Sequence, residues 1–140
     1  MNTEELMIGD WVSLFQGNPD GSSCNVQVNY IGEYGEVGIE GCEEYTSANC
    51  NLLFPIPLTA EILEKNGFTI KEKWAQIGNF GNSPLIMWHF VDDPILGDYN
   101  TELEVHQNDT DKVHVHIPCK YVHELQHALR LCGIDKNIEL

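Results

Sequence analysis

The sequence predicts an α+β protein in which a small antiparallel β lobe precedes an antiparallel sheet with two helices. Short apolar runs separated by Gly-rich connections fill about the first sixty residues. A helix with clear start and stop signals follows, and longer strand-like runs then lead to an amphipathic stretch near the end. We expect a boundary between residues 1–57 and 58–140, with one compact domain as the alternative.

Four short strands are predicted in the N-terminal lobe. Their side chains alternate or are rich in aromatic and β-branched types, and a turn-rich loop at 16–23 separates the first two. The expected strands are Trp11–Phe15, Val26–Tyr30, Val37–Ile39 and Leu52–Phe54. Strands of this spacing favour a curled sheet, and we expect a small barrel of the Src-homology-3 type.

A short helix is predicted directly after this lobe. Thr59 is a favourable N-cap, and Leu58 can pack against Leu63 one turn later. Gly67 suits the left-handed conformation that ends a helix, with Phe68 folding back onto Leu63. We expect a packing element with no chemistry of its own.

Four further strands and a terminal helix are predicted in residues 58–140. The strands are Lys73–Ile77, Pro84–Val91, 102–106 and 113–117, and the helix covers 120–132 with Gly133 at its end. In the last two strands, apolar and polar side chains alternate strictly, and this pattern predicts a hairpin. With Val105 opposite Val113, the outward pairs are Glu104 with His114 and Glu102 with His116. We interpret these pairs as ordinary surface partners, with metal binding by the two histidines as the alternative.

The charge of the chain is strongly negative. It holds 22 acidic and 7 basic residues, for a net charge of −15, and no Lys or Arg occurs before Lys65. Five glutamates fall between Glu33 and Glu44. Such a surface repels phosphates, so we expect no direct binding of nucleic acid. The simplest interpretation is a solvated acidic surface. The more specific hypotheses are contacts with a basic protein partner, or mimicry of nucleic acid to inhibit such a partner.

Compartment signals are those of a cytoplasmic protein. The five cysteines form no C-x-x-C pair, which favours free thiols. The longest apolar stretch, Pro84–Val91, is too short to cross a bilayer, and the acidic start does not resemble a signal peptide. We therefore expect no membrane association.

The string from His123 to His127 matches the H-E-x-x-H pattern of zinc peptidases. Two histidines four residues apart share one helix face and can bind one Zn²⁺, while Glu124 can serve as the general base on a metal-bound water. A catalytic zinc also needs a third protein ligand. The metzincin pattern is excluded because Arg130 and Gly133 replace its Gly and its last His. The remaining candidates are His114, His116 and Glu139.

A helical wheel favours a simpler interpretation of this helix. Val122, Leu125, Ala128, Leu129 and Cys132 form one apolar stripe. His123 and His127 fall on the opposite side beside Arg130, so we expect them to face solvent. We accordingly predict no catalytic residue, no metal and no cofactor, with a zinc-dependent hydrolase or peptidase as the alternative.

Three tryptophans are candidate walls of a small-molecule site. These are Trp11, Trp74 and Trp88, and we expect them to pack in the core, with ligand binding as the alternative.

Three segments of the chain resemble a family of short uncharacterised proteins associated with bacterial prophages and mobile elements. They are Leu6-x-Ile8-Gly9-x-x-Val12, Ile56-Pro57-Leu58-Thr59 with Leu63 and Gly67-Phe68, and Lys120-Tyr121-Val122-His123-x-Leu125-Gln126. The family pattern includes the positions of His123 and Gln126 and does not require Glu124 or His127. The resemblance therefore implies that the H-E-x-x-H string is incidental, and it supplies no activity. We expect a non-enzymatic accessory protein that acts through protein contacts.

Overall fold

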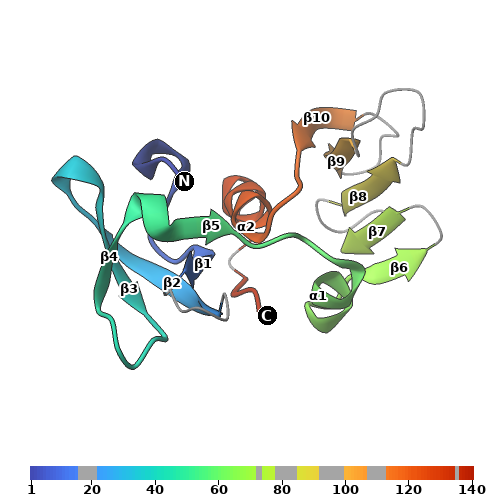
Figure 1. The fold of residues 1–140 in the computed structure, drawn as a ribbon. Helices are drawn as coiled ribbons and strands as arrows, with labels where there is room; N and C mark the ends of the chain where they lie inside the picture. Colours follow the sequence, from blue (N-terminus) through green and yellow to red (C-terminus); the bar gives the residue numbers. More distant parts are fainter. Residues whose placement is uncertain (16–21, 72–73, 78–84, 92–99, 107–112, 135) are drawn as a thin grey trace. The chain divides into compact units, whose positions relative to one another are not determined.

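The computed structural model describes residues 1–15, 22–71, 74–77, 85–91, 100–106, 113–134 and 136–140 (Figure 1). These residues confirm the α+β class, because they form two five-stranded antiparallel sheets accompanied by two α-helices. The chain divides into two units, which we describe separately. Unit 1 comprises Met1–Pro57 with Tyr121–His127, and unit 2 comprises Leu58–Lys120 with Ala128–Leu140.

The sheet of unit 1 has the strand order β4-β3-β2-β1-β5 (Figure 1). Its strands are β1 Trp11–Phe15, β2 Ser23–Ile31, β3 Glu36–Glu40, β4 Ser47–Asn49 and β5 Leu53–Pro55. The first three predicted strands are confirmed, whereas the fourth begins one residue late because Leu52 ends a short 3-10 helix, Cys50–Leu52. Among the described residues the order remains open from β4 to β5, so no closed barrel is present there.

Strand β4 was not predicted. Its sequence, Ser-Ala-Asn, has low strand propensity, and it becomes a strand by pairing with β3 through Val37 opposite Ala48 and Gly38 opposite Ser47. The pairing across the sheet thus overrides the local preference of these three residues.

The core of unit 1 is formed by the inward side chains of this sheet. On β1 and β2 the residues Val12, Leu14, Val26 and Val28 are buried. Tyr30, expected to continue the alternation of Val26 and Val28, is instead exposed, because the register with β3 shifts between Val28 and Tyr30. The remaining buried members are Leu6, Val37, Ile39, Cys50 and Leu53. The chain turns sharply at Gly9 and Asp10, just before β1, with Gly9 at φ 89°.

In unit 2, helix α1 (Ala60–Lys65) has both predicted ends. The Thr59 hydroxyl accepts the Ile62 N–H at 3.3 Å, and Gly67 lies at φ 77°. The Phe68 N–H then donates to the Leu63 carbonyl at 3.0 Å, as expected for a glycine-terminated helix.

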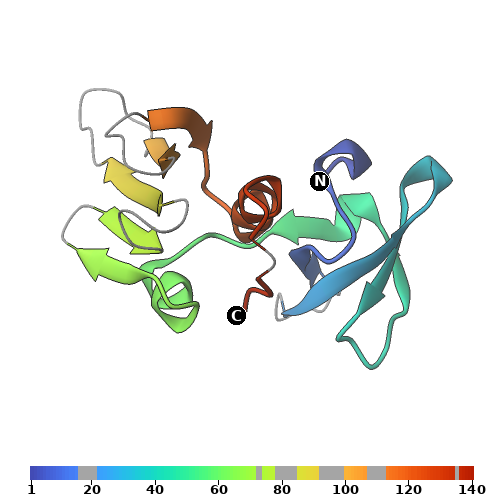
Figure 2. The ribbon, with the colours of Figure 1, turned by 180° about the vertical axis from the view of Figure 1, so that it is seen from behind.

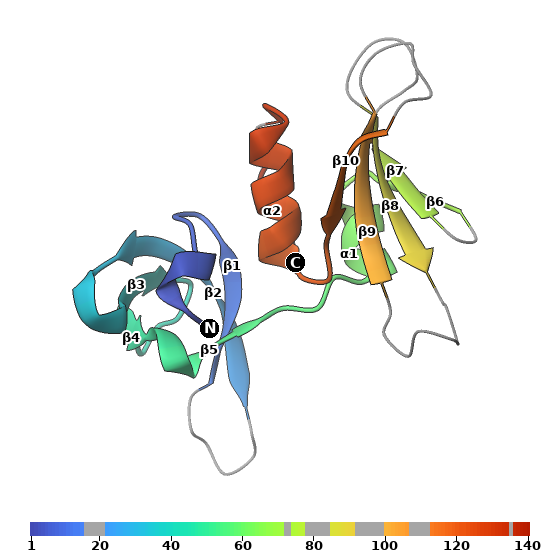
Figure 3. The same cartoon turned by 90° about the horizontal axis from the view of Figure 1, so that it is seen from above.

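The sheet of unit 2 has the order β10-β9-β8-β7-β6, and α1 lies beside β6 (Figures 1 and 2). Its strands are β6 Thr69–Lys71, β7 Trp74–Ile77, β8 Leu85–Val91, β9 Asn100–His106 and β10 Val113–Pro118. Figure 3 shows these strands side by side from above. The strand β6 was not predicted, and the predicted turn at 78–83 lies outside the described residues.

The hairpin of β9 and β10 is confirmed, but its predicted register is wrong. Val113 pairs with His106 and Val115 with Val105, with an irregularity between them. Glu104 therefore lies opposite His116, and Glu102 lies opposite Pro118, so neither predicted Glu and His pair forms. Alternation alone defines the face of each residue, whereas register depends on loop geometry and bulges.

The terminal helix α2 spans Val122–Leu131, close to the predicted 120–132. Gly133 lies at φ 70°, and the Ile134 N–H donates to the Leu129 carbonyl at 2.9 Å, which confirms the predicted end. Residues 136–140 belong to no helix or strand. Ile138 is buried, and the backbone of Glu139 exchanges two hydrogen bonds with the Asn66 amide, at 2.7 and 2.9 Å.

Candidate functional site

The first turns of α2 place the H-E-x-x-H string inside unit 1. His123 is 5% exposed and Gln126 is 3% exposed, and the His127 side chain is 20% exposed. The prediction that both histidines face solvent is therefore wrong. A helical wheel identifies one apolar stripe, and it contains no information about polar partners that another segment supplies.

Asp10 is the principal partner of His127. Its side chain is fully buried, and its Oδ2 lies 2.7 Å from His127 Nε2. The same oxygen accepts the Met7 N–H at 2.7 Å. A buried carboxylate requires such partners, because its desolvation is costly when it is unpaired. The pair therefore joins the start of α2 to the turn that precedes β1.

Gln126 joins the same two segments by a second route. Its Oε1 accepts the Trp11 N–H at 2.9 Å, and its Nε2 donates to the Gly9 carbonyl at 2.9 Å. Gln27 from β2 donates to that carbonyl as well, at 2.9 Å. The amide thus satisfies backbone groups that the sheet does not pair.

Glu124 has a local structural role. Its Oε2 accepts the N–H of Tyr121, the residue immediately before α2, at 3.0 Å. A glutamate at the third helical position that reaches back to the cap residue is half of a capping box. The candidate general base of the zinc hypothesis therefore stabilises the start of the helix.

His123 differs from His127 in its surroundings. Its ring stacks on Tyr121 with centroids 5.9 Å apart, and its Nδ1 is buried with no hydrogen-bond partner among the described residues. Burial lowers the pKa of His123 below its ordinary value of 6.5; the carboxylates of Glu124 and Asp10 oppose this shift, and His127 adds to it. The nearby Glu5 also opposes the shift. The neutral imidazole is the favoured form.

This lowered pKa predicts an acid-sensitive stability. The unfolded chain binds a proton at His123 near pH 6.5, whereas the folded chain binds it only at lower pH. The contribution of neutral His123 to stability is therefore fully present above pH 6.5, the ordinary pKa. It is lost as the pH falls through the lower pKa that His123 has in the folded chain. We expect the free energy of unfolding, measured with urea as a function of pH, to fall more steeply for the parent than for His123→Phe. Parallel curves for the two proteins would contradict this expectation.

No third metal ligand is brought to these histidines within the described residues. The part of the chain that the structure describes contains no group of three His, Cys, Asp or Glu side chains suited to a metal ion. The candidate Glu139 belongs to unit 2, where its side chain is exposed. The side chains of His114 and His116 lie outside the described residues.

The tryptophans proposed as walls of a small-molecule site are described only in part. The side chains of Trp74 and Trp88 lie outside the described residues, and Trp11 is half-buried.

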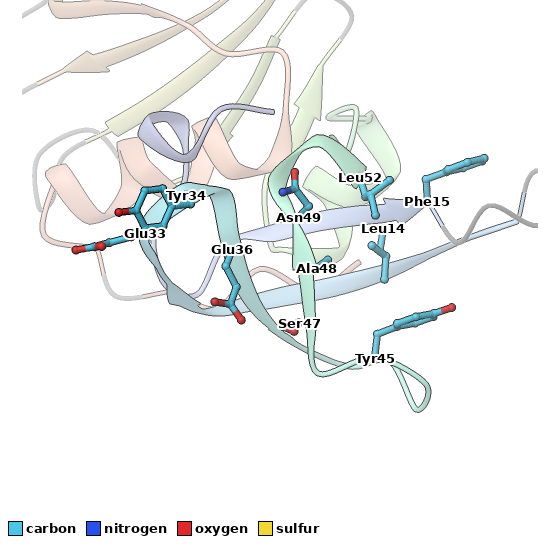
Figure 4. Close-up of a pocket in the computed structure, with 10 residues that line it drawn as sticks. All are labelled: Leu14, Phe15, Glu33, Tyr34, Glu36, Tyr45, Ser47, Ala48, Asn49 and Leu52. Atoms are coloured by element: carbon cyan, nitrogen blue, oxygen red, sulfur yellow. The ribbon is translucent and has the colours of Figure 1, made fainter.

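A groove on unit 1 brings together residues that the sequence did not connect. It has a volume of about 550 Å³ and combines aromatic and aliphatic side chains with two carboxylates (Figure 4). We define the groove by its lining residues, which are Leu14, Phe15, Glu33, Tyr34, Glu36, Tyr45, Ser47, Ala48, Asn49 and Leu52. Glu33, Tyr34 and Glu36 lie on one side of β4, and Leu14, Phe15 and Leu52 lie on the other.

Tyr34 is the most unusual residue of the groove. Its side chain is 97% exposed, and its backbone lies in the left-handed region at φ 61° and ψ 24°. That conformation costs a non-glycine residue about 1–2 kcal/mol, and such strain is concentrated at functional positions. An exposed aromatic ring on a strained turn is consistent with a binding role.

Sequence reasoning identified only the glutamates of this groove. The stretch between Glu33 and Glu44 was singled out by its charge, whereas Tyr34, Tyr45 and Phe15 gave no signal because they come from separate segments. Their convergence depends on the pairing of β3 with β4 and on the curl of the sheet.

The described residues define a small α+β protein. In unit 1, Gln126 and His127 of α2 are hydrogen-bonded to the segment 9–11, and a separate groove carries two carboxylates. No protein-family model, curated protein or solved structure matches the chain. Among the helices that the structure describes, none is long and apolar enough to cross a membrane.

Proposed function

We propose that this protein is a non-enzymatic accessory protein that binds a basic protein partner through the groove of unit 1. The observation that carries the proposal is the groove itself, where Glu33 and Glu36 accompany the exposed rings of Tyr34 and Tyr45. Aromatic faces attract cations, and carboxylates at the same surface reinforce that attraction.

The charge of unit 1 supports this choice of partner. Its sequence contains ten Asp and Glu residues and no Lys or Arg. A cationic segment that approaches the groove therefore meets no fixed positive side chain of unit 1, whereas an anionic one is repelled. The excess of negative charge on unit 1 also disfavours direct contact with nucleic-acid phosphates.

The alternative, zinc-dependent hydrolysis, receives less support. Its base, Glu124, is bonded to the Tyr121 N–H, and one of its ligands, His127, is bonded to Asp10. These contacts favour a structural role for the motif. The prophage or mobile-element origin that the sequence resemblance implies remains part of the proposal, as does a relationship of the unit 1 sheet to Src-homology-3-type barrels.

The groove is tested with matched charge variants. We expect the double variant Glu33→Gln/Glu36→Gln to bind fluorescent oligolysine about three- to tenfold more weakly than the parent, because each exposed charge pair contributes up to about 1 kcal/mol. The control is Glu43→Gln/Glu44→Gln, which removes the same charge at exposed positions outside the groove. Fluorescence anisotropy at low salt gives the dissociation constants. Equal weakening of both variants would show only a diffuse electrostatic attraction and would contradict the proposal.

A further inference from the structure

Strand β4 forms an end of the unit 1 sheet in the part of the chain that the structure describes. It pairs with β3 on one side, and the strand order of the sheet ends with it. The Ile39 N–H donates to the Thr46 carbonyl at 3.0 Å. In an antiparallel pair, hydrogen-bonded positions alternate, so the next such position is Val37 opposite Ala48. The N–H and C=O of Ser47 and the N–H of Asn49 therefore point away from β3, whereas the Asn49 carbonyl, at the N-cap of the 3-10 helix Cys50–Leu52, accepts the first bond of that helix.

The groove follows this edge. Ser47, Ala48 and Asn49 all line it, and Leu14, Leu52 and Phe15 lie on the side of β4 opposite Glu36 (Figure 4). An outward row of backbone donors and acceptors is a template for another strand. Beside β4 it is accompanied by apolar side chains that such a strand can cover.

The two faces of β4 differ in chemistry. Ala48 packs against the core cluster, on the inner face, whereas Ser47 and Asn49 are exposed and share the outer face with Glu36. A strand added here presents one set of alternate side chains to the core side, near Leu14 and Leu52. It presents the other set outward, where a Lys side chain can extend across Asn49 toward Glu36.

We propose that the groove binds its partner as an extended segment, with alternating apolar and basic side chains, that adds antiparallel to the edge of β4. This inference rests on the proposed function and specifies the form in which the basic partner binds. Charge complementarity selects a basic segment, since unit 1 has no Lys or Arg of its own. The outward backbone groups of Ser47 and Asn49 select an extended one.

The probe is the capped peptide Lys-Val-Lys-Val-Lys, with binding measured by calorimetry and by fluorescence anisotropy of a labelled copy. In antiparallel addition the lysines lie opposite Ser47 and Asn49, so their amides face β4 and the valine amides face away. We expect N-methylation of the lysine amides to weaken binding at least tenfold. Methylation of the valine amides changes neither charge nor the β4-facing edge, and we expect it to leave binding within about twofold.

The outcomes separate this inference from the proposed function. Equal binding of both methylated peptides, still weakened by Glu33→Gln/Glu36→Gln, would overturn strand addition and leave the basic-partner proposal standing. If the lysine-methylated peptide binds more strongly than the valine-methylated peptide, the proposed antiparallel register is wrong. No binding of the parent peptide together with no binding of oligolysine would overturn both proposals.

A protein variant gives an independent readout. Ser47→Pro removes an outward N–H at a sheet edge, a position where proline is tolerated because no bond to β3 is lost. We expect thermal unfolding to change little and binding of the parent peptide to weaken at least tenfold. A folded Ser47→Pro protein that binds as tightly as the parent would contradict the inference.

Discussion

Asp10→Ala is expected to lower the free energy of unfolding of unit 1 by about 3–5 kcal/mol, because two hydrogen bonds to a buried carboxylate are lost and each contributes about 1.5–3 kcal/mol. The carboxylate is fully buried and holds both His127 Nε2 and the Met7 N–H at 2.7 Å. Its removal leaves the partly exposed His127 Nε2 and the Met7 N–H without their shared partner. We expect the start of α2 to loosen from the turn at Gly9–Trp11 as a result.

The measurement is urea unfolding combined with hydrogen exchange at the Met7 amide, which reports on unit 1 directly. Asp10→Asn is the matched control, because it keeps an oxygen for the Met7 N–H and removes only the charge, and we expect a smaller loss of about 1–2 kcal/mol. A double-mutant cycle with His127→Ala isolates the pair itself. Additive losses in that cycle would show that Asp10 and His127 do not stabilise one another.

Gln126→Leu is expected to cost about 2–3 kcal/mol even though the two side chains are similar in size. The Trp11 N–H loses its acceptor, and a buried donor without a partner costs more than an average hydrogen bond contributes. The Gly9 carbonyl still accepts from Gln27 and loses only one of its two donors. The expected loss therefore comes mainly from the Trp11 amide.

Gln27→Leu is the natural control for this change. It removes the other donor to the Gly9 carbonyl, leaves the Gln126 bridge intact and lies at a half-buried position. We expect it to cost about 1 kcal/mol or less. Equilibrium unfolding of both variants in urea measures the difference, and a Gln126→Leu protein no less stable than Gln27→Leu would refute the bridging role of Gln126.

Local signals predicted much of the fold. Alternation located β1, β2 and β3, and cap residues located both ends of α1 and the end of α2, because each of these features depends on neighbours within one turn or one strand. Two strands, β4 and β6, were missed because their pairing partners, and not their own residues, make them strands. The hairpin of β9 and β10 was found with the wrong register for a related reason, since register is a property of two segments and their connection.

The H-E-x-x-H string shows most clearly the difference between what local sequence determines and what tertiary contacts decide. The sequence alone predicted a helix over 120–132, which the structure places at 122–131. It also determined that the chain is strongly acidic and that no extended metzincin pattern follows His127. Only the tertiary structure decided that His127 meets Asp10, that Gln126 bridges Gly9 and Trp11, and that aromatic residues from three segments converge beside β4. Side chains more than a hundred positions apart can pair only after the chain has folded, and no periodicity within a helix encodes a partner that lies on another segment.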